Sequence, residues 1–167
     1  MLIVFAGPPC AGKSTLAAEV ARRRNLPLLS MDATRRRILP AAAHTRADRQ
    51  VAYRAMHFAA ELLLGAGSSA ILDAPYGHQE DRDELARIAA GVDLRLIECQ
   101  VSPETAVRRF RERGPDAVRL DLTEELVRQM VRDFPYTRAG LVVDTETHSQ
   151  RECVERIERY LRRSADS

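Results

Sequence analysis

Five short apolar runs recur along the chain and predict β-strands, and helical patterns fill the intervals between them. The runs are Leu2–Ala6, Leu28–Ser30, Ser69–Asp73, Leu94–Val101 and Leu141–Asp144. The helical patterns cover about Lys13–Arg24, Ala33–Leu39, Ala47–Leu64, Glu80–Ala90, Pro103–Arg113, Thr123–Phe134 and Ser149–Arg163. Strands separated by helices imply a parallel sheet with helices on both faces. We therefore expect an α/β fold with a five-stranded parallel sheet and with ligands at the carboxyl ends of the strands.

The length and composition are those of one ordinary globular domain. The chain has 167 residues, of which 45% are hydrophobic and 30% are charged, so a single core can form without disulfides or metals. No repeat or linker interrupts the pattern, and we expect a single domain over residues 1–167. Residues 114–122 are the least patterned stretch, and they predict a short lid at about residues 109–122.

Net charge and cysteine usage indicate which surfaces the protein binds and in which cellular compartment it works. A net charge of +2 gives no reason to expect a surface that coats nucleic acid or adheres to a membrane. Cys10, Cys99 and Cys153 are odd in number and far apart, which favours reduced thiols over a disulfide framework. No apolar run approaches the roughly 18 residues of a membrane span. We expect a cytoplasmic protein.

The segment between the first strand and the first helix carries the pattern G-x-x-x-x-G-K-[ST], known as Walker A. Lys13 within it is the only lysine among the 26 Lys and Arg residues. Such a loop points backbone N–H groups at phosphate, and its glycines allow close approach. The lysine neutralises the β- and γ-phosphates, and the serine hydroxyl can ligate Mg²⁺. The predicted nucleotide-binding residues are Gly7, Cys10, Ala11, Gly12, Lys13, Ser14 and Thr15, with Lys13 also catalytic.

Two of the expected strands lead to an acid, Asp32 after the second strand and Asp73 at the end of the third. Both then lie at the edge of the sheet where phosphates bind. Asp32 is a candidate general base for an acceptor hydroxyl, and the alternative is an N-cap of the following helix. Arg35, one turn further on, is a candidate acceptor ligand. Asp73 is a candidate magnesium ligand together with Ser14, and a simple turn is the alternative.

Arg109 and Arg113 lie one helical turn apart in the pattern and are expected on one face of the helix. In a lid, such arginines can stabilise the charge of a transferring phosphoryl group. A solvated charged helix is the alternative, and the sequence leaves open which arginine matters more. The histidines show no metal-ligand spacing, and we expect structural or surface roles for His44, His57, His78 and His148.

Taken together, these motifs resemble the small P-loop kinases, which include polynucleotide 5′-kinase, gluconate kinase, chloramphenicol phosphotransferase and the zeta toxins. The likeness covers nearly the whole chain through Gly7–Thr15, S-M-D-x-x-R at Ser30–Arg35, I-L-D-A at Ile71–Ala74 and V-S-P-E-x-x-x-x-R-x-x-x-R-G at Val101–Gly114. The resemblance implies the P-loop NTPase fold, with Asp32 as general base, Arg35 as ligand of an acceptor phosphate, and Arg109 and Arg113 as lid arginines. One departure is Ala74-Pro75-Tyr76, where polynucleotide kinases usually continue Ala-Thr-Asn.

The sequence and the resemblance together predict a kinase that binds ATP and Mg²⁺ and transfers the γ-phosphoryl group to a hydroxyl of a small-molecule acceptor. A polynucleotide or nucleoside 5′-hydroxyl kinase is the alternative, although an aromatic content of 5% without Trp offers little for base stacking. A nucleotide-dependent ATPase switch is less favoured, and an Asn-Lys-x-Asp base reader is absent because Asn25 is the only asparagine. We expect the acceptor pocket to form from residues 39–57, the loop at 75–79 and the lid.

Overall fold

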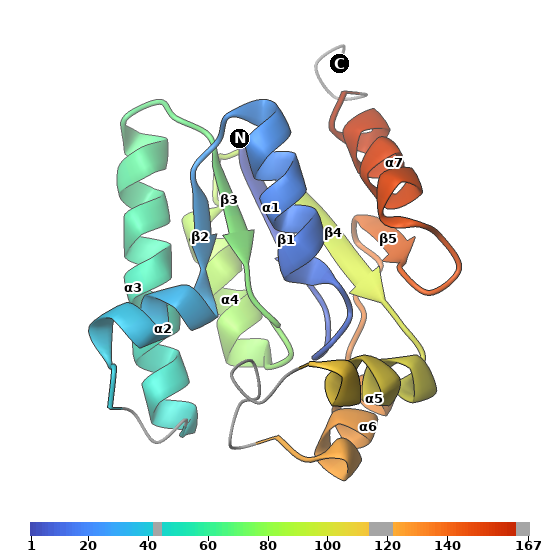
Figure 1. Ribbon diagram of the computed structural model, residues 1–167. Helices are drawn as coiled ribbons and strands as arrows, with labels where there is room; N and C mark the ends of the chain where they lie inside the picture. Colours follow the sequence, from blue (N-terminus) through green and yellow to red (C-terminus); the bar gives the residue numbers. More distant parts are fainter. Residues whose placement is uncertain (42–44, 114–121, 163–167) are drawn as a thin grey trace.

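The computed structural model describes residues 1–41, 45–113 and 122–162, and they form an α/β fold around one parallel sheet (Figure 1). The strands are β1 (Leu2–Ala6), β2 (Leu28–Ser30), β3 (Ala70–Asp73), β4 (Leu94–Gln100) and β5 (Leu141–Asp144), in the order β2-β3-β1-β4-β5. The helices are α1 (Lys13–Arg24), α2 (Met31–Ile38), α3 (Arg46–Gly65), α4 (Gln79–Ile88), α5 (Pro103–Glu112), α6 (Glu124–Arg132) and α7 (Gln150–Arg162). Every pairing is parallel. The predicted fold class is confirmed, and each element lies within two residues of its predicted bounds.

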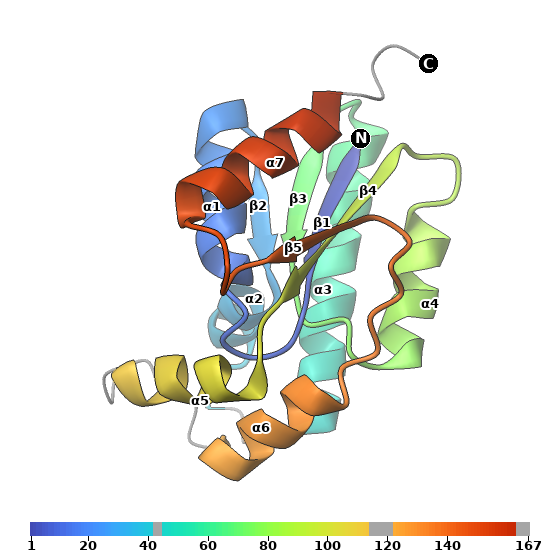
Figure 2. The ribbon, with the colours of Figure 1, turned by 90° about the vertical axis from the view of Figure 1, so that its right-hand side faces the viewer.

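Helices cover both faces of the sheet, as the sequence pattern implies. Figure 2 shows α1 and α7 on one face and α3 and α4 on the other. Successive residues of β1 point to opposite faces, so Ile3 and Phe5 join the core under α1 and α7, whereas Leu2 and Val4 join the core under α3 and α4. All four side chains are fully buried. A continuously apolar strand is therefore required at the centre of this sheet.

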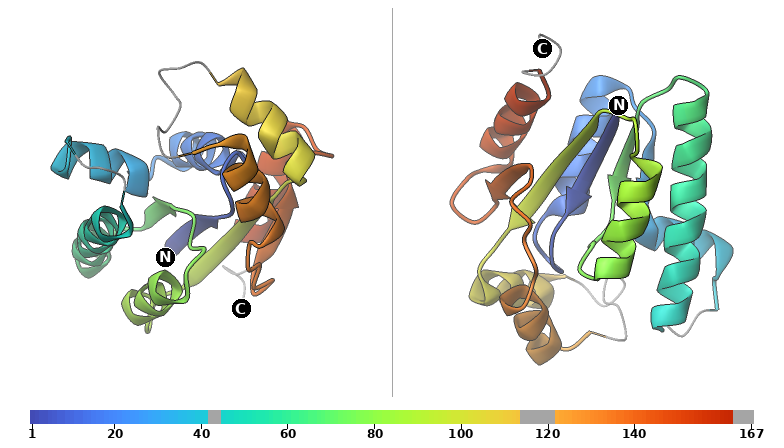
Figure 3. Two further views of the ribbon diagram at one scale, coloured as in Figure 1. Left: turned by 90° about the horizontal axis from the view of Figure 1, so that it is seen from below. Right: turned by 180° about the vertical axis from the view of Figure 1, so that it is seen from behind.

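The carboxyl ends of the strands share one end of the molecule. β1 runs from the upper to the lower end in Figure 1, and because all strands are parallel their carboxyl ends lie at the lower end. There, α5 and α6 pack beside each other, and α2 lies on the other side of the strand ends, packed against α3 (Figure 3). This arrangement places the segments that follow β1, β2 and β3 close together. These are the segments in which the sequence predicts the site.

Gly140, just before β5, has no room for a side chain. A Cβ atom there would overlap the main-chain carbonyl oxygen of Leu96 in β4. The close approach lets β5 begin its pairing with β4 at Leu141 and Ile97. Gly65, at the end of α3, is the opposite case, because an added Cβ would meet no atom within 4 Å.

We therefore expect Gly140→Ala to lower the free energy of unfolding by about 1–3 kcal/mol, since β5 must move away from β4 to admit the methyl group. Gly65→Ala is the matched control and should change stability by no more than about 0.5–1 kcal/mol, in the stabilising direction. Urea denaturation of both variants measures the difference. Equal midpoints for the two variants would contradict this account of the edge of the sheet.

A buried polar cluster links α3 to the segment after β3. His57 is 1% exposed, and its Nε2 atom lies 3.0 Å from the hydroxyl of Tyr76. Its Nδ1 atom lies 3.5 Å from the Glu84 carboxylate on α4. Burial lowers the pKa of His57 below its ordinary value of 6.5, and Glu84 opposes that shift. Its predicted structural role agrees with this placement.

The lowered pKa of His57 predicts a loss of stability in mild acid. Below about pH 6.5 the unfolded chain protonates this histidine while the folded chain keeps it neutral, so stability falls as the pH drops toward the folded pKa. The loss can reach about 1.4 kcal/mol per pH unit. His57→Gln should show a smaller difference between the unfolding free energies at pH 7.5 and pH 5.5 than the wild type does. The comparison of slopes stands even if the variant is less stable at both pH values, and parallel slopes would refute the role of His57.

Candidate active site

The loop after β1 closes through backbone conformations that glycine makes accessible. Gly7 and Gly12 have φ angles of 144° and 80°, and Cys10 between them has a φ angle of 60°. A Cβ atom on Gly7 would lie 2.6 Å from the carbonyl oxygen of Cys99 in β4, so only glycine fits there. The Gly7 N–H donates to the carbonyl of Pro75 at 3.2 Å. The loop is thus held between β4 and the segment that follows β3.

Helix α1 presents its N-terminus to the inside of this loop. Its first intrahelical hydrogen bond runs from Leu16 N–H to the carbonyl of its N-cap, Gly12, at 3.1 Å. The N–H groups of Lys13, Ser14 and Thr15 precede that bond, and such groups form an anion site with the helix dipole. The geometry is therefore that of a phosphate-binding loop.

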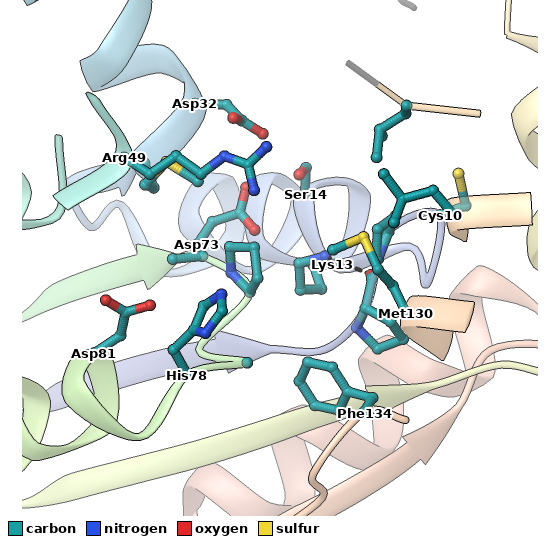
Figure 4. A pocket seen from close by; sticks show the side chains of 18 of the residues that line it. Cys10, Lys13, Ser14, Asp32, Arg49, Asp73, His78, Asp81, Met130 and Phe134 are labelled. Carbon is teal, nitrogen blue, oxygen red and sulfur yellow. Dashed lines mark hydrogen bonds between the residues drawn. The ribbon is translucent and has the colours of Figure 1, made fainter. Parts of the chain in front are cut away.

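Lys13 lies over the loop and is half-buried. Its Nζ atom donates to the carbonyl of Pro8 at 2.8 Å, as the dashed line in Figure 4 marks. Burial lowers the pKa of Lys13, and the carboxylate of Asp73 is the strongest influence in the opposite direction. An ammonium that is partly desolvated and held above a ring of N–H groups interacts strongly with phosphate.

A cavity of about 360 Å³ opens between the phosphate loop and helices α3, α4 and α6. The predicted residues Cys10, Lys13, Ser14, Asp32 and Asp73 all line it. Asp73 ends β3 and is 5% exposed. Figure 4 shows the Asp32 and Asp73 carboxylates on the same side of the cavity as the Ser14 hydroxyl. Residues from three separate strand ends thus meet in one place, as expected at the carboxyl edge of an α/β sheet.

Asp32 is the second residue of α2 and is not its N-cap. The helix begins at Met31, and its N-cap is Ser30, whose side chain makes no capping hydrogen bond. The alternative of a capping role at a helix near Ala33 is therefore wrong. Asp32 instead lines the cavity, half-buried, as the prediction of a general base requires.

Arg35, unlike Asp32, does not line the cavity. It is 5% exposed and is not among the residues that line the cavity. Arg35 lies four residues after Met31 and shares its buried face of α2, although Met31 does line the cavity. The cavity receives Arg46 and Arg49 of α3 instead. Both were missed as individual residues, although they fall inside the segment predicted to contribute to the acceptor pocket.

Arg109 braces the phosphate loop from its outer side. Its guanidinium donates to the carbonyl of Cys10 at 3.1 Å, to Oγ1 of Thr145 at 3.0 Å and to the carbonyl of Thr145 at 2.6 Å. Arg109 lines a second cavity of about 390 Å³ together with Gly12 and Thr15. The geometry gives it a positioning role, whereas the sequence suggested contact with the transferring phosphoryl group.

Arg113 lines both cavities, so it is the member of the pair that borders the main one. Helix α5 ends at Glu112, and Arg113 is exposed at its C-cap. Both arginines thus border the second cavity, although Arg113 lies one residue beyond the last helical residue. The remainder of the predicted lid, residues 114–121, lies outside the described residues.

The segment after β3 contributes a histidine that sequence reasoning missed. His78 is the N-cap of α4 and lines the main cavity, and Figure 4 shows its ring between Asp81 and the loop. The loop that carries it is anchored by Tyr76, which has a φ angle of 53° and whose N–H donates to the hydroxyl of Tyr53 at 2.9 Å. Only the predicted involvement of loop 75–79 pointed to this residue. His148, also expected at the surface, lines the second cavity.

Within residues 1–41, 45–113 and 122–162, no group of three or more His, Cys, Asp or Glu side chains could hold a metal ion. Among the same residues, no helix has the length and apolar character needed to cross a membrane.

These features define a P-loop protein with a kinase-like α/β fold, and comparisons with known proteins agree. A solved structure from Chloroflexus aurantiacus, of a protein to which a kinase activity has been ascribed, has a TM-score of 0.78 and 26% identity and covers 96% of this chain and 94% of its own. A gluconokinase from Sinorhizobium meliloti has a TM-score of 0.75 and 20% identity over 98% of this chain and 93% of its own. An APS kinase from Mycobacterium tuberculosis, solved with AMPPNP and APS, has a TM-score of 0.72 and 19% identity over 96% of each chain.

The family model described as AAA domain matches residues 2–137, and the chain belongs to this family. The expected resemblance to the small P-loop kinases is confirmed. A comparison with curated proteins finds no match.

The effect of the Arg109 hydrogen bonds can be distinguished from the effect of losing a surface charge by comparing two variants. Arg109→Ala removes three hydrogen bonds from a charged donor, so we expect the free energy of unfolding to fall by about 1.5–3 kcal/mol and nucleotide binding to weaken. Arg108→Ala is the control, because Arg108 is exposed and its nearest carboxylate, on Glu112, is 3.9 Å away. Chemical denaturation and titration with ATP measure both effects, and equal behaviour of the two variants would contradict the brace.

Proposed function

We propose that the protein is an ATP-dependent kinase that transfers the γ-phosphoryl group of ATP to a hydroxyl of a small molecule. The observation that supports this proposal best is the cavity beside the phosphate loop. Lys13, Ser14 and Asp73 border its phosphate end, and the cavity extends past Asp32 toward α3 and α6. A volume of about 360 Å³ leaves room for an acceptor there.

In this proposal each residue has a separate part in the transfer. The acceptor oxygen forms a bond to the γ-phosphorus while the bond to the β-γ bridging oxygen breaks, which leaves ADP and a phosphate ester. Asp32 takes the proton that the acceptor hydroxyl loses. Lys13 and Arg113 stabilise negative charge on the phosphates, and Arg109 positions the loop through Cys10. The second cavity, on the outer side of the loop, is the proposed place of the nucleoside.

The residues present also fit a magnesium ion. A hydroxyl and a carboxylate, from Ser14 and Asp73, border the same cavity beside the phosphate loop. Mg²⁺ prefers such oxygen ligands and usually completes its shell with water and phosphate oxygens, so a cluster of three acidic side chains is not needed. When bound, the ion would neutralise charge on the phosphates.

Asp32→Asn separates a kinase from an ATPase. If Asp32 accepts the proton of the acceptor, this variant should transfer phosphate about 10²–10⁴-fold more slowly while its KM for ATP is nearly unchanged. Lys13→Ala should lose both transfer and hydrolysis, because it removes charge from the phosphates. Asp83→Asn, an exposed position on α4 that does not line the cavity, is the matched control and should behave as wild type.

The measurement follows labelled γ-phosphate from ATP into a panel of alcohols and, in parallel, into free phosphate. Transfer by Asp32→Asn at the wild-type rate would show that Asp32 is not the base. Release of free phosphate by the wild type with no labelled ester from any alcohol would favour the ATPase alternative over the kinase.

A further inference from the structure

The acceptor end of the main cavity has two unlike walls. The side chains labelled on one side in Figure 4 are polar, and those on the other are apolar. The polar wall comes from α2, α3, β3 and the start of α4, and its members are Asp32, Arg49, Asp73, His78 and Asp81. The apolar wall comes from α6 and the residues beside it. Its apolar members are Leu122, Leu126, Met130, Phe134 and Pro135, and Gln129 and Asp133 of the same segment also line the cavity.

The positive charges on the polar wall face carboxylates of the protein itself. Arg46 makes a bidentate ion pair with Asp81, with both nitrogen–oxygen distances at 2.9 Å, and Asp81 is 3% exposed. In Figure 4 the guanidinium of Arg49 points toward Asp32 and Asp73. An anionic acceptor would have to share these arginines with carboxylates that are already desolvated, which is unfavourable.

The remaining cations that line the cavity belong to its phosphate end. Among the described residues, these are Lys13, whose pKa responds to both Asp73 and Asp32, and Arg113 at the end of α5. Both are needed for the charge of the nucleotide phosphates in the proposed reaction. Within the described ranges, little positive charge is then left for a charged acceptor or for the phosphates of an oligonucleotide.

The apolar wall is a fixed surface of the fold. Val127 and Val131 of α6 are buried in the core under α1, which leaves Met130 and Phe134 half-exposed toward the cavity. The ring of Phe134 packs against Tyr136 with a centroid distance of 4.8 Å. The segment that follows is held by the buried carboxylate of Glu98, which accepts the N–H groups of Thr137 and Arg138 at 2.8 and 2.7 Å.

Resting on the proposed kinase activity, we propose that the acceptor is an uncharged alcohol that carries an aryl or alkyl group. Its hydroxyl faces Asp32, and its apolar group packs against Met130 and Phe134. Burial of an apolar group against these side chains supplies affinity without requiring a cation, whereas the balanced polar wall rejects a net negative charge. Phe134 is then a residue that determines acceptor specificity.

Four probes that differ in one property each can test this class. They are 3-phenoxy-1,2-propanediol, which is neutral and aryl-bearing; glycerol, which is neutral without an apolar group; D-glycerate, which is anionic; and a 5′-hydroxyl oligonucleotide, which is polyanionic. We expect kcat/KM for phosphate transfer to the phenoxy diol to exceed that for glycerol and for D-glycerate by at least about tenfold. The same order is expected for binding, followed by saturation-transfer NMR in the presence of Mg²⁺ and AMPPNP.

Substitutions of Phe134 test whether the apolar wall causes this preference for the phenoxy diol. Phe134→Ala should lower kcat/KM for the phenoxy diol about tenfold and leave glycerol nearly unchanged. Phe134→Leu, which keeps an apolar side chain, should retain most of the preference. Leu62→Ala truncates an apolar residue that is 60% exposed on α3 and does not line the cavity, so it is the control for general effects of truncation.

The possible results separate this inference from the proposed function. Preference for D-glycerate or for the oligonucleotide would overturn the inference while the kinase activity stands. Preferential binding of the phenoxy diol without transfer to any alcohol would overturn the kinase activity, but the ligand class would stand if Phe134→Ala abolishes that binding. Equal binding of the phenoxy diol and glycerol, or equal loss of both in Phe134→Ala, would overturn the inference.

Discussion

The close approach of Gly7 to the backbone of β4 fixes the geometry on which the site depends. Because Gly7 has no Cβ atom, the chain leaving β1 can pass directly beside the carbonyl of Cys99, and its N–H reaches the carbonyl of Pro75 beyond β3. The exits of three adjacent strands are thereby joined by main-chain contacts alone. Lys13 and Asp73 both line the cavity beside this junction, and Lys13 also donates to the carbonyl of Pro8 in the loop. Because main-chain contacts hold the strand ends together, the polar side chains beside them are available to bind and stabilise a substrate.

The departure at Ala74-Pro75-Tyr76 has a structural counterpart in the loop after β3. Tyr76 adopts a positive φ angle, which for a residue other than glycine costs about 1–2 kcal/mol. Its N–H, carbonyl and hydroxyl each have a partner, in Tyr53, Arg82 and His57 respectively, and these contacts offset the cost. The inward turn of Tyr76 directs Gly77 and His78 toward the cavity. The segment at Ala74–Tyr76, which departs from the polynucleotide kinases, is therefore part of the wall that we propose to bind the acceptor.

Much of the fold could be predicted because its signals are local. The apolar runs of β1, β2 and β5 have the bounds that the sequence predicts, and the phosphate loop is a contiguous motif. The sequence is less informative where the outcome depends on contacts between distant segments. Arg35, expected to be an acceptor ligand, is buried on α2 and does not line the cavity. The walls formed by Arg46, His78 and Phe134 come from different elements, and their meeting is a property of tertiary structure that no spacing in the sequence records.

Arg109 in α5 and Arg113 just beyond its end differ in how firmly they are held beside the site. Arg109 is tied to main-chain carbonyls on both the phosphate loop and the start of the β5–α7 segment, so it fixes the distance between two parts of the sheet edge. Arg113 lies beyond the last helical residue, is exposed, and borders both cavities. A group that must follow charge as it moves from one phosphate oxygen to another needs freedom, whereas a group that sets the geometry of the loop must have none. The same residue type at the two positions thus meets two different surroundings, and the hydrogen-bond partners rather than the residue type distinguish them.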